Sequence, residues 1–206
     1  MQAAITPEKA LELLMEGNKR FVNNLKANRN LLQQANETSD GQHPFAIILS
    51  CIDSRTSAEL IFDQGLGDIF SVRIAGNIVN EDILGSMEFA CKVSGSKMIV
   101  VLGHTRCGAI KGACQHVEMG NLTALLSKIR PAVEDVLESS GNSSCEVDEF
   151  VEHVAEVNVR RSVKSIMERS LILSEMIKKG EIGIIGGMHD ITTGHVTYLE
   201  DTKHFN

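Results

Sequence analysis

The chain of 206 residues carries a formal net charge of −7, with 43% hydrophobic and 23% charged residues. These values are typical of an ordinary soluble globular protein, and the length suits one domain with a sizeable core. The excess of acidic residues also argues against a nucleic-acid-binding surface, because affinity for phosphate backbones depends on clustered Lys and Arg. We therefore expect a single domain over residues 1–206, in which residues 1–40 form an N-terminal helical arm.

The N-terminal segment, MQAAITPEKALELLMEGNKRF, carries acids where a signal peptide would carry a basic start and a continuous apolar core. No apolar run in the sequence approaches the roughly 18–20 residues that are needed to span a bilayer. We therefore expect a cytoplasmic protein that does not bind membranes.

The five cysteines, at positions 51, 91, 107, 114 and 145, are odd in number and too sparse for a disulfide scaffold. In a reducing compartment, cysteines that are grouped with histidine indicate metal binding or catalysis. Cys91, Cys114 and Cys145 lie in helix-like segments without such companions. We expect these three to be small thiols that are packed in the core or lie at the surface.

The elements follow one another in a regular alternation. Thr6-Pro7-Glu8 predicts a helix start, and apolar residues at helical spacing follow it as far as residue 22. Residues 27–44 are rich in Asn and Gln, and we predict an extended connector there. Strands are predicted at 45–50, 68–74, 98–103 and 182–186. Helices are predicted at 56–64, 81–93, 107–138 and 146–179, with interruptions at Pro131 and Ser170. Residues 189–201 predict a turn at Thr193-Gly194 that leads into a last strand.

Alternating strands and helices predict an α/β fold, with a mainly parallel sheet flanked by helices, an N-terminal helical arm and a C-terminal edge strand. The near-continuous β-branched runs suit strands that are covered on both faces. Functional sites in such sheets gather at the carboxyl ends of the strands. Two noteworthy motifs fall there: CIDSR follows the strand at 45–50, and GHTRCG follows the strand at 98–103.

Cys51, His104 and Cys107 in these motifs form a soft ligand set that suits tetrahedral zinc. A structural zinc site closes with four ligands, whereas three ligands and an open position are typical of a catalytic site. A single cysteine at a strand end is more often a packing residue, and a single histidine more often caps a backbone carbonyl. The two motifs at two strand ends together favour the metal site.

Other motifs do not support a different function. GHTRCGA has the glycine spacing of a phosphate-binding loop but lacks the Lys-Ser/Thr that completes it. QGLGDIF lacks the third glycine of a dinucleotide fingerprint. His189, Asp190 and His195 lie in a segment that resembles a hairpin, and no partner motif accompanies them.

CIDSR and GHTRCGAIKGA together resemble the β-class carbonic anhydrases, and LMEGNKRF, DIFSVRIAGN, EVNVRRSVKSI and GGMHDITTGHVTYL extend the likeness over nearly the whole chain. The resemblance implies that Cys51, His104 and Cys107 bind Zn²⁺ and that Asp53 and Arg55 form a catalytic dyad. It also implies further site residues: Gln42, which contacts substrate across a dimer interface, and the pocket residues Phe70, Ala75 and Gly108.

The resemblance further implies reversible hydration of CO2 to bicarbonate and a proton. Hydroxide formed on the zinc attacks CO2, and the Asp53–Arg55 dyad orients it. The partners are then CO2 or bicarbonate and a second copy of the chain, in a homodimer or a dimer-based tetramer. Hydrolysis of CS2 or COS on the same fold is an alternative, and a catalytically silent zinc scaffold protein is another.

Some β-class relatives close their zinc site by binding the aspartate as a fourth ligand when bicarbonate fills a side pocket lined by tryptophan. The matching position here is Ile48, and the chain contains no tryptophan, although Arg73 matches the arginine of that pocket. We therefore expect an open site in which Asp53 is hydrogen-bonded to Arg55. Asp53 would bind the metal only in a closed, inactive form.

Overall fold

The structure is a computed structural model that describes residues 5–140 and 147–205. Its elements, in chain order, are α1 (Pro7–Val22), α2 (Leu31–Glu37), β1 (Ala46–Ser50), α3 (Ala58–Ile61), β2 (Ile69–Arg73), η1 (Ala75–Asn77), α4 (Glu81–Glu88), η2 (Phe89–Val93), β3 (Met98–His104), α5 (Gly108–Cys114), α6 (Gly120–Leu126), α7 (Arg130–Ser140), α8 (Asp148–Arg169), α9 (Leu171–Lys178), β4 (Gly183–His189) and β5 (Val196–His204).

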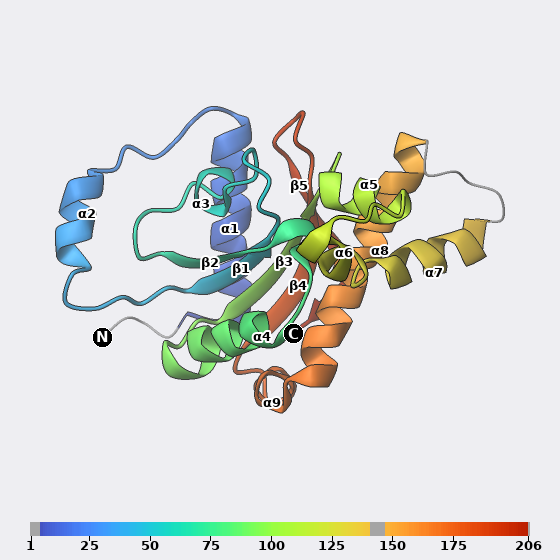
Figure 1. Ribbon diagram of the computed structural model, residues 1–206. Helices are drawn as coiled ribbons and strands as arrows, with labels where there is room; N and C mark the ends of the chain where they lie inside the picture. The colour runs from blue at the N-terminus through green and yellow to red at the C-terminus, as the bar shows by residue number, and fades with distance from the viewer. Residues whose placement is uncertain (1–4, 141–146, 206) are drawn as a thin grey trace.

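The strands form one sheet in the order β2-β1-β3-β4-β5 within the described residues (Figure 1). β1 pairs in parallel with β2 and β3, β3 pairs in parallel with β4, and β5 pairs antiparallel with β4 at one edge. The predicted α/β fold, with its mainly parallel sheet and C-terminal edge strand, is confirmed. The parallel order brings the carboxyl ends of β1, β3 and β4 to the same edge of the sheet.

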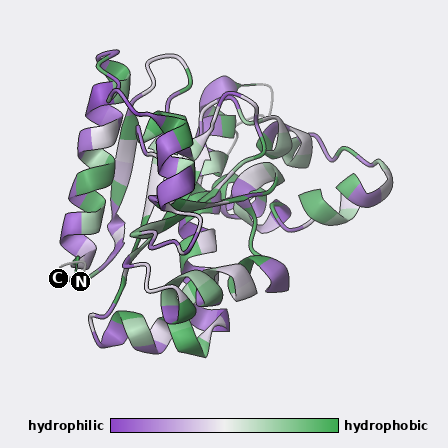
Figure 2. Ribbon diagram, turned by 90° about the vertical axis from the view of Figure 1, so that its left-hand side faces the viewer, coloured by the Kyte–Doolittle hydropathy of each residue, from purple (hydrophilic) through white to green (hydrophobic). Residues whose placement is uncertain are grey.

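Helices cover both faces of the sheet, which explains the near-continuous apolar runs of the strands. In β1, Ile47 and Leu49 join the core under α4, α5, α7, α8 and α9, whereas Ala46 and Ile48 join the core under α1 and α3. Figure 2 shows the consequence: the central strands are mostly hydrophobic, while the surrounding helices carry both hydrophobic and hydrophilic residues. The alternation of strand side chains therefore supplies two cores rather than one.

The predicted connector at 27–44 is wrong in its middle, where α2 forms. The Asn30 side chain caps this helix by accepting a hydrogen bond from the Gln33 amide at 3.1 Å. No residue of α2 is buried, so the segment lacks the apolar periodicity by which a helix is detected. In Figure 1, α2 lies at the left-hand edge of the molecule, away from the sheet.

The two predicted helix interruptions occur. Pro131 lies in the first turn of α7, where its missing N–H costs no helical hydrogen bond. The predicted helix at 107–138 is accordingly divided into α5, α6 and α7. Ser170 ends α8 and caps α9, because its hydroxyl accepts a hydrogen bond from the Leu173 amide at 3.2 Å.

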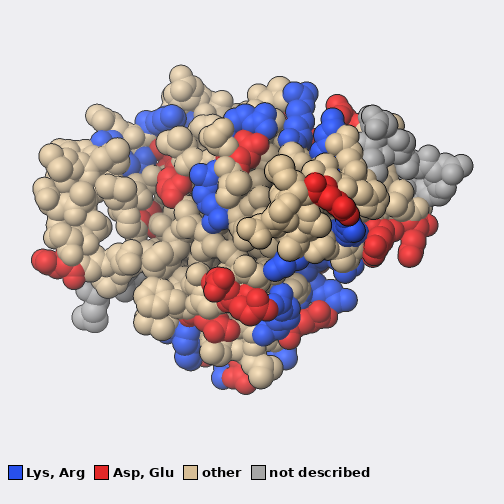
Figure 3. All heavy atoms as spheres, viewed as in Figure 1, with Lys and Arg blue, Asp and Glu red and all other residues tan. Residues whose placement is uncertain are grey.

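Cys91 and Cys114 are buried, as expected, and Cys145 lies outside the described residues. None of the helices within residues 5–140 and 147–205 is both long and apolar enough to cross a lipid bilayer. On the face shown in Figure 3, basic and acidic residues are interspersed.

Candidate metal centre

The three predicted zinc ligands meet at the carboxyl edge of the sheet. Cys51 directly follows β1, His104 is the last residue of β3, and Cys107 is the N-cap of α5. β1 and β3 are neighbours, with Ser50 opposite Leu102. Two adjacent parallel strands therefore deliver both motifs to one place.

The spacing of the three ligand atoms fits a zinc ion. They lie within 4.8 Å of one another, and the two sulfur atoms are 3.9 Å apart. Two sulfurs bound to tetrahedral zinc at about 2.3 Å would be about 3.8 Å apart. Within the described part of the chain, this is the only group of three such residues that could hold a metal.

The orientation of His104 also fits. Its Nδ1 lies 2.9 Å from the Thr105 carbonyl oxygen, so Nδ1 carries the hydrogen and donates it. Nε2 is then left with its lone pair, and this atom is buried without a hydrogen-bond partner among the described residues. A ligand histidine in proteins is held in the same way, because the bond from the other nitrogen sets both tautomer and ring orientation.

The cluster favours a thiolate at Cys51. Hydrogen bonding from Cys107 is the largest cause and, together with smaller contributions from His104 and the Gly76 amide, outweighs burial and lowers the pKa of Cys51 to about 4. The same sulfur–sulfur hydrogen bond, together with burial, raises the pKa of Cys107. Burial opposes protonation of His104, but the adjacent Cys51 raises its pKa above the usual value. A metal cation would replace the shared protons.

Asp53 and Arg55 form the pair that the sequence predicts. Arg55 Nε and a terminal nitrogen lie 2.9 and 2.7 Å from the two carboxylate oxygens, and the Arg55 amide adds a bond of 3.0 Å. These hydrogen bonds hold the pKa of Asp53 well below its usual range. Arg73 supports the same loop, since it donates to the carbonyl oxygens of Cys51 and Asp53 at 3.0 and 2.7 Å.

Ala75 and Gly108 lie beside the cluster. Ala75 begins η1, whose Gly76 amide donates to the Cys51 sulfur at 3.4 Å, and Gly108 directly follows Cys107 at the start of α5. Both predicted pocket residues therefore lie beside the candidate metal ligands Cys51 and Cys107.

Phe70 and Gln42 are not brought to the cluster within one chain. Phe70 pairs with Ile47, four residues before Cys51 in β1, so it lies toward the amino end of the strands. Its ring packs edge-to-face on Phe89, with centroids 6.3 Å apart. Gln42 is exposed and precedes β1, again on the amino side.

His189 is a residue of the site that sequence reasoning missed. It ends β4, directly opposite His104, and is 2% exposed. Neither of its ring nitrogens has a hydrogen-bond partner among the described residues, and burial lowers its pKa to about 4. Its sequence signal is a histidine three residues after the predicted strand at 182–186, at the start of the segment that resembles a hairpin.

A family model described as "Carbonic anhydrase" matches residues 46–196. Carbonic anhydrase 2 of Mycobacterium tuberculosis is 38% identical over 199 residues, which cover 91% of this chain and 90% of the relative. The carbonic anhydrase of Mycolicibacterium smegmatis is 36% identical, with 92% of each chain covered.

Among solved structures, a β-carbonic anhydrase of Aspergillus fumigatus is similar, with a TM-score of 0.73 and 28% identity over 83% of this chain and 85% of that one. The β-carbonic anhydrase CcaA has the same TM-score at 26% identity, over 91% of this chain and 94% of that one. The family model, the relatives and the fold agree with the ligand geometry, and the chain therefore belongs to the β-class carbonic anhydrases, a family of enzymes.

Proposed function

We propose that the protein catalyses the zinc-dependent, reversible hydration of CO2 to bicarbonate and a proton at the Cys51–His104–Cys107 centre. One observation carries the proposal: three ligand atoms within 4.8 Å of one another lie beside a carboxylate that Arg55 holds. A zinc scaffold without catalysis would not require that carboxylate pair.

Zinc in such a site lowers the pKa of a water molecule and so supplies hydroxide near neutral pH. The chain's own residues then orient the reactants. Asp53 is ionised and can only accept hydrogen bonds, so it can accept one from hydroxide and leave an oxygen lone pair directed at CO2. Arg55 donates hydrogen bonds to both carboxylate oxygens, and this bidentate contact keeps Asp53 from rotating toward the metal.

The test is a direct assay of zinc-replete protein with CO2, COS and CS2 in parallel. We expect rapid CO2 hydration that is lost when a chelator removes the zinc and restored when zinc returns. Hydrolysis of CS2 or COS without CO2 hydration would assign the alternative chemistry. Full zinc occupancy with none of the three activities would support a silent scaffold.

We further propose that the active unit is at least a homodimer, with the partner supplying Gln42 and Phe70. Both residues lie toward the amino ends of their own strands, away from the ligand cluster. The α2 segment carries exposed leucines at 31 and 32 and projects from the body, and Figure 3 shows a gap between it and the rest of the molecule. A related β-carbonic anhydrase of Sordaria macrospora is described as tetrameric.

The open edge of the sheet supports this assembly. Among the residues that the structure describes, β2 is an edge strand with no neighbouring strand on its outer side. A hollow of about 640 Å³ lies there, and Phe70 and Phe89 are among the residues that line it. An exposed edge beside apolar side chains is a surface that proteins cover, and a second copy would cover it here.

Gln42→Ala should reduce turnover without releasing zinc, because Gln42 would contact substrate across the dimer interface and not the metal. Turnover, zinc content and mass by light scattering should be measured on the same sample. Gln115→Ala is the matched control, since it removes the same side chain from an exposed position at the end of α5, outside the segments proposed for the interface. A fully active monomer would contradict the shared pocket.

CO2 hydration should still be increasing with pH above neutrality. Two thiolates give zinc more electron density than three imidazoles do. The pKa of a water molecule on zinc should therefore be higher here than the value of roughly 7 in a three-histidine site. Asp53 cannot cause the rise, because its lowered pKa keeps it ionised throughout. Initial rates from pH 6 to 9 check this, and a flat profile would be inconsistent with the two-thiolate centre.

A further inference from the structure

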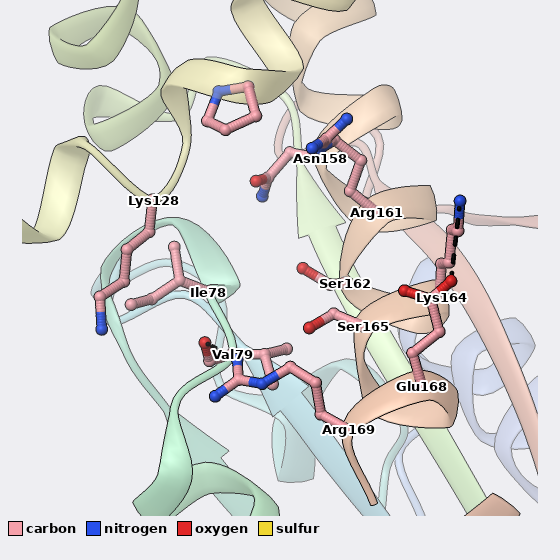
Figure 4. A pocket seen from close by; sticks show the side chains of 11 residues that line it. Ile78, Val79, Lys128, Asn158, Arg161, Ser162, Lys164, Ser165, Glu168 and Arg169 are labelled. Atoms are coloured by element: carbon pink, nitrogen blue, oxygen red, sulfur yellow. Dashed lines mark hydrogen bonds and ion pairs between the residues drawn. The ribbon is translucent and has the colours of Figure 1, made fainter.

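Helix α8 makes an unusual set of polar contacts with the loops around the metal centre. A hollow of about 520 Å³ separates it from the loop after η1. Figure 4 shows Asn158, Ser162 and Arg169 projecting from α8 toward Ile78 and Val79. Three of the four cations that line this hollow are paired with acids, at Arg161–Asp135, Lys164–Glu168 and Arg169–Glu81. The contacts that bear on the metal centre are those that α8 makes with the two loops.

Glu152 of α8 holds the turn that carries His104 and Cys107. Its Oε1 accepts a hydrogen bond of 2.8 Å from the backbone amide of Arg106, between the two ligands. Arg106 has a φ of 54°, a left-handed conformation that costs free energy for a residue with a side chain. A charge-assisted hydrogen bond to this amide stabilises the conformation that directs both ligands inward.

Asn158, further along the same helix, holds the loop beside Cys51. Its side chain is 4% exposed and donates to the Gly76 carbonyl oxygen at 2.9 Å. The amide of Gly76 in turn donates to the Cys51 sulfur at 3.4 Å. Gly76 has a φ of 65°, and a Cβ there would lie 2.5 Å from Ile129 Cδ1, so this position requires glycine.

We propose that Glu152 and Asn158 are positioning residues of the metal centre: Glu152 sets the His104–Cys107 turn, and Asn158 directs the Gly76 amide onto the Cys51 sulfur. The inference rests on the proposed zinc site. One helix thereby supports both ligand-bearing loops, which arrive from different strands. Such outer contacts fix ligand geometry and tune the electron density that sulfur gives to a metal.

Zinc affinity tests the role of Glu152, by competition of the full-length protein against a chromophoric chelator. Glu152→Ala should weaken zinc binding roughly 10- to 100-fold. Glu152→Gln keeps an acceptor oxygen for the Arg106 amide and should recover most of that loss. Glu149→Gln is the control, because it removes a charge from the exposed first turn of α8.

Arg106→Gly keeps the result interpretable if Glu152→Ala folds poorly. Glycine adopts the left-handed conformation at little cost, so the loss caused by Glu152→Ala should be smaller in the Arg106→Gly background. Unchanged affinity in Glu152→Ala, or an equal loss in Glu149→Gln, would overturn the assignment. Wild-type protein that binds no zinc would instead refute the proposed function.

The electronic effect of Asn158 can be read from Co²⁺-substituted protein. Asn158→Leu keeps the side-chain volume but removes the donor to Gly76. The Cys51 sulfur should lose its amide hydrogen bond, so the sulfur-to-cobalt absorption band should shift to longer wavelength. In the zinc enzyme, the midpoint of the pH–rate profile should rise, because a more electron-rich sulfur makes the metal less acidic.

Ser162→Ala is the matched control for Asn158. The Ser162 hydroxyl donates to the next carbonyl oxygen of the loop, that of Asn77, at 3.2 Å. The Ser162→Ala variant therefore loses a hydrogen bond to the same loop but keeps the one to Gly76. We expect its cobalt band to stay in place. An unshifted band in Asn158→Leu, or an equal shift in Ser162→Ala, would refute the role of Asn158.

Discussion

Cys107→Ala should abolish zinc binding and CO2 hydration together. Wild-type protein should contain about one zinc per chain, and the variant should contain almost none after gel filtration. The physical reason is that a site with three protein ligands becomes a two-ligand site, whose residual donors are too few to retain zinc. Elemental analysis and the CO2 assay on the same samples measure both effects.

The control for this variant is Cys91→Ala. Cys91 is buried in the core under α4 and η2 and does not belong to the group of three residues that could hold a metal. It should keep its zinc and its activity. His104→Ala should reproduce the loss, which guards against a folding defect peculiar to position 107. Full zinc occupancy in Cys107→Ala would contradict the assignment of Cys107 as a zinc ligand.

Arg55→Ala should abolish activity while zinc remains bound. In the structure, Arg55 holds both oxygens of Asp53, and the aspartate is not part of the ligand cluster. Without these hydrogen bonds, the ionised Asp53 carboxylate is free to rotate toward a divalent cation and to occupy its fourth coordination position. Loss of a positioned acid–base group alone costs roughly 10²- to 10⁴-fold in rate, and blockage of the metal adds to it.

X-ray absorption at the zinc edge distinguishes an Asp53 carboxylate that has bound the metal from one that has only lost its orientation. We expect the fourth ligand of Arg55→Ala to be a carboxylate oxygen that disappears in the double variant with Asp53→Ala. Arg55→Lys keeps the positive charge but cannot form the bidentate contact with Asp53. The activity of this variant should therefore lie between that of the wild type and that of Arg55→Ala. An Arg55→Ala enzyme that kept its rate would contradict the restraint.

The amino-acid pattern predicts the sheet, which the structure confirms, and it predicts the candidate ligand set, whose three side chains the structure brings together. The strands were detectable because β-branched runs that are buried on both faces leave a continuous apolar pattern, which does not depend on which helices cover them. Cys51, His104 and Cys107 were detectable because each lies within three residues of a strand end. In a parallel sheet those ends meet at one edge, so local spacing already predicts proximity.

Helix α2 escaped prediction for the opposite reason. It buries no residue, so no apolar period marks it, and its one local signal is the cap at Asn30. Its position apart from the body follows from the same absence of a buried face. A pattern-based reading detects helices that bury an apolar face within the chain, and α2 buries no residue.

Only the tertiary structure decided which side chains surround the ligands. Glu152 reaches Arg106 across 46 residues of sequence, and Asn158 reaches Gly76 across 82. His189 stands opposite His104 because β4 pairs with β3 in one register and no other. No spacing in the sequence links these residues to the ligand cluster, since a hydrogen bond to a backbone group from a distant element leaves no local pattern. Their roles depend on where α8 and β4 pack, and that is set by the whole core.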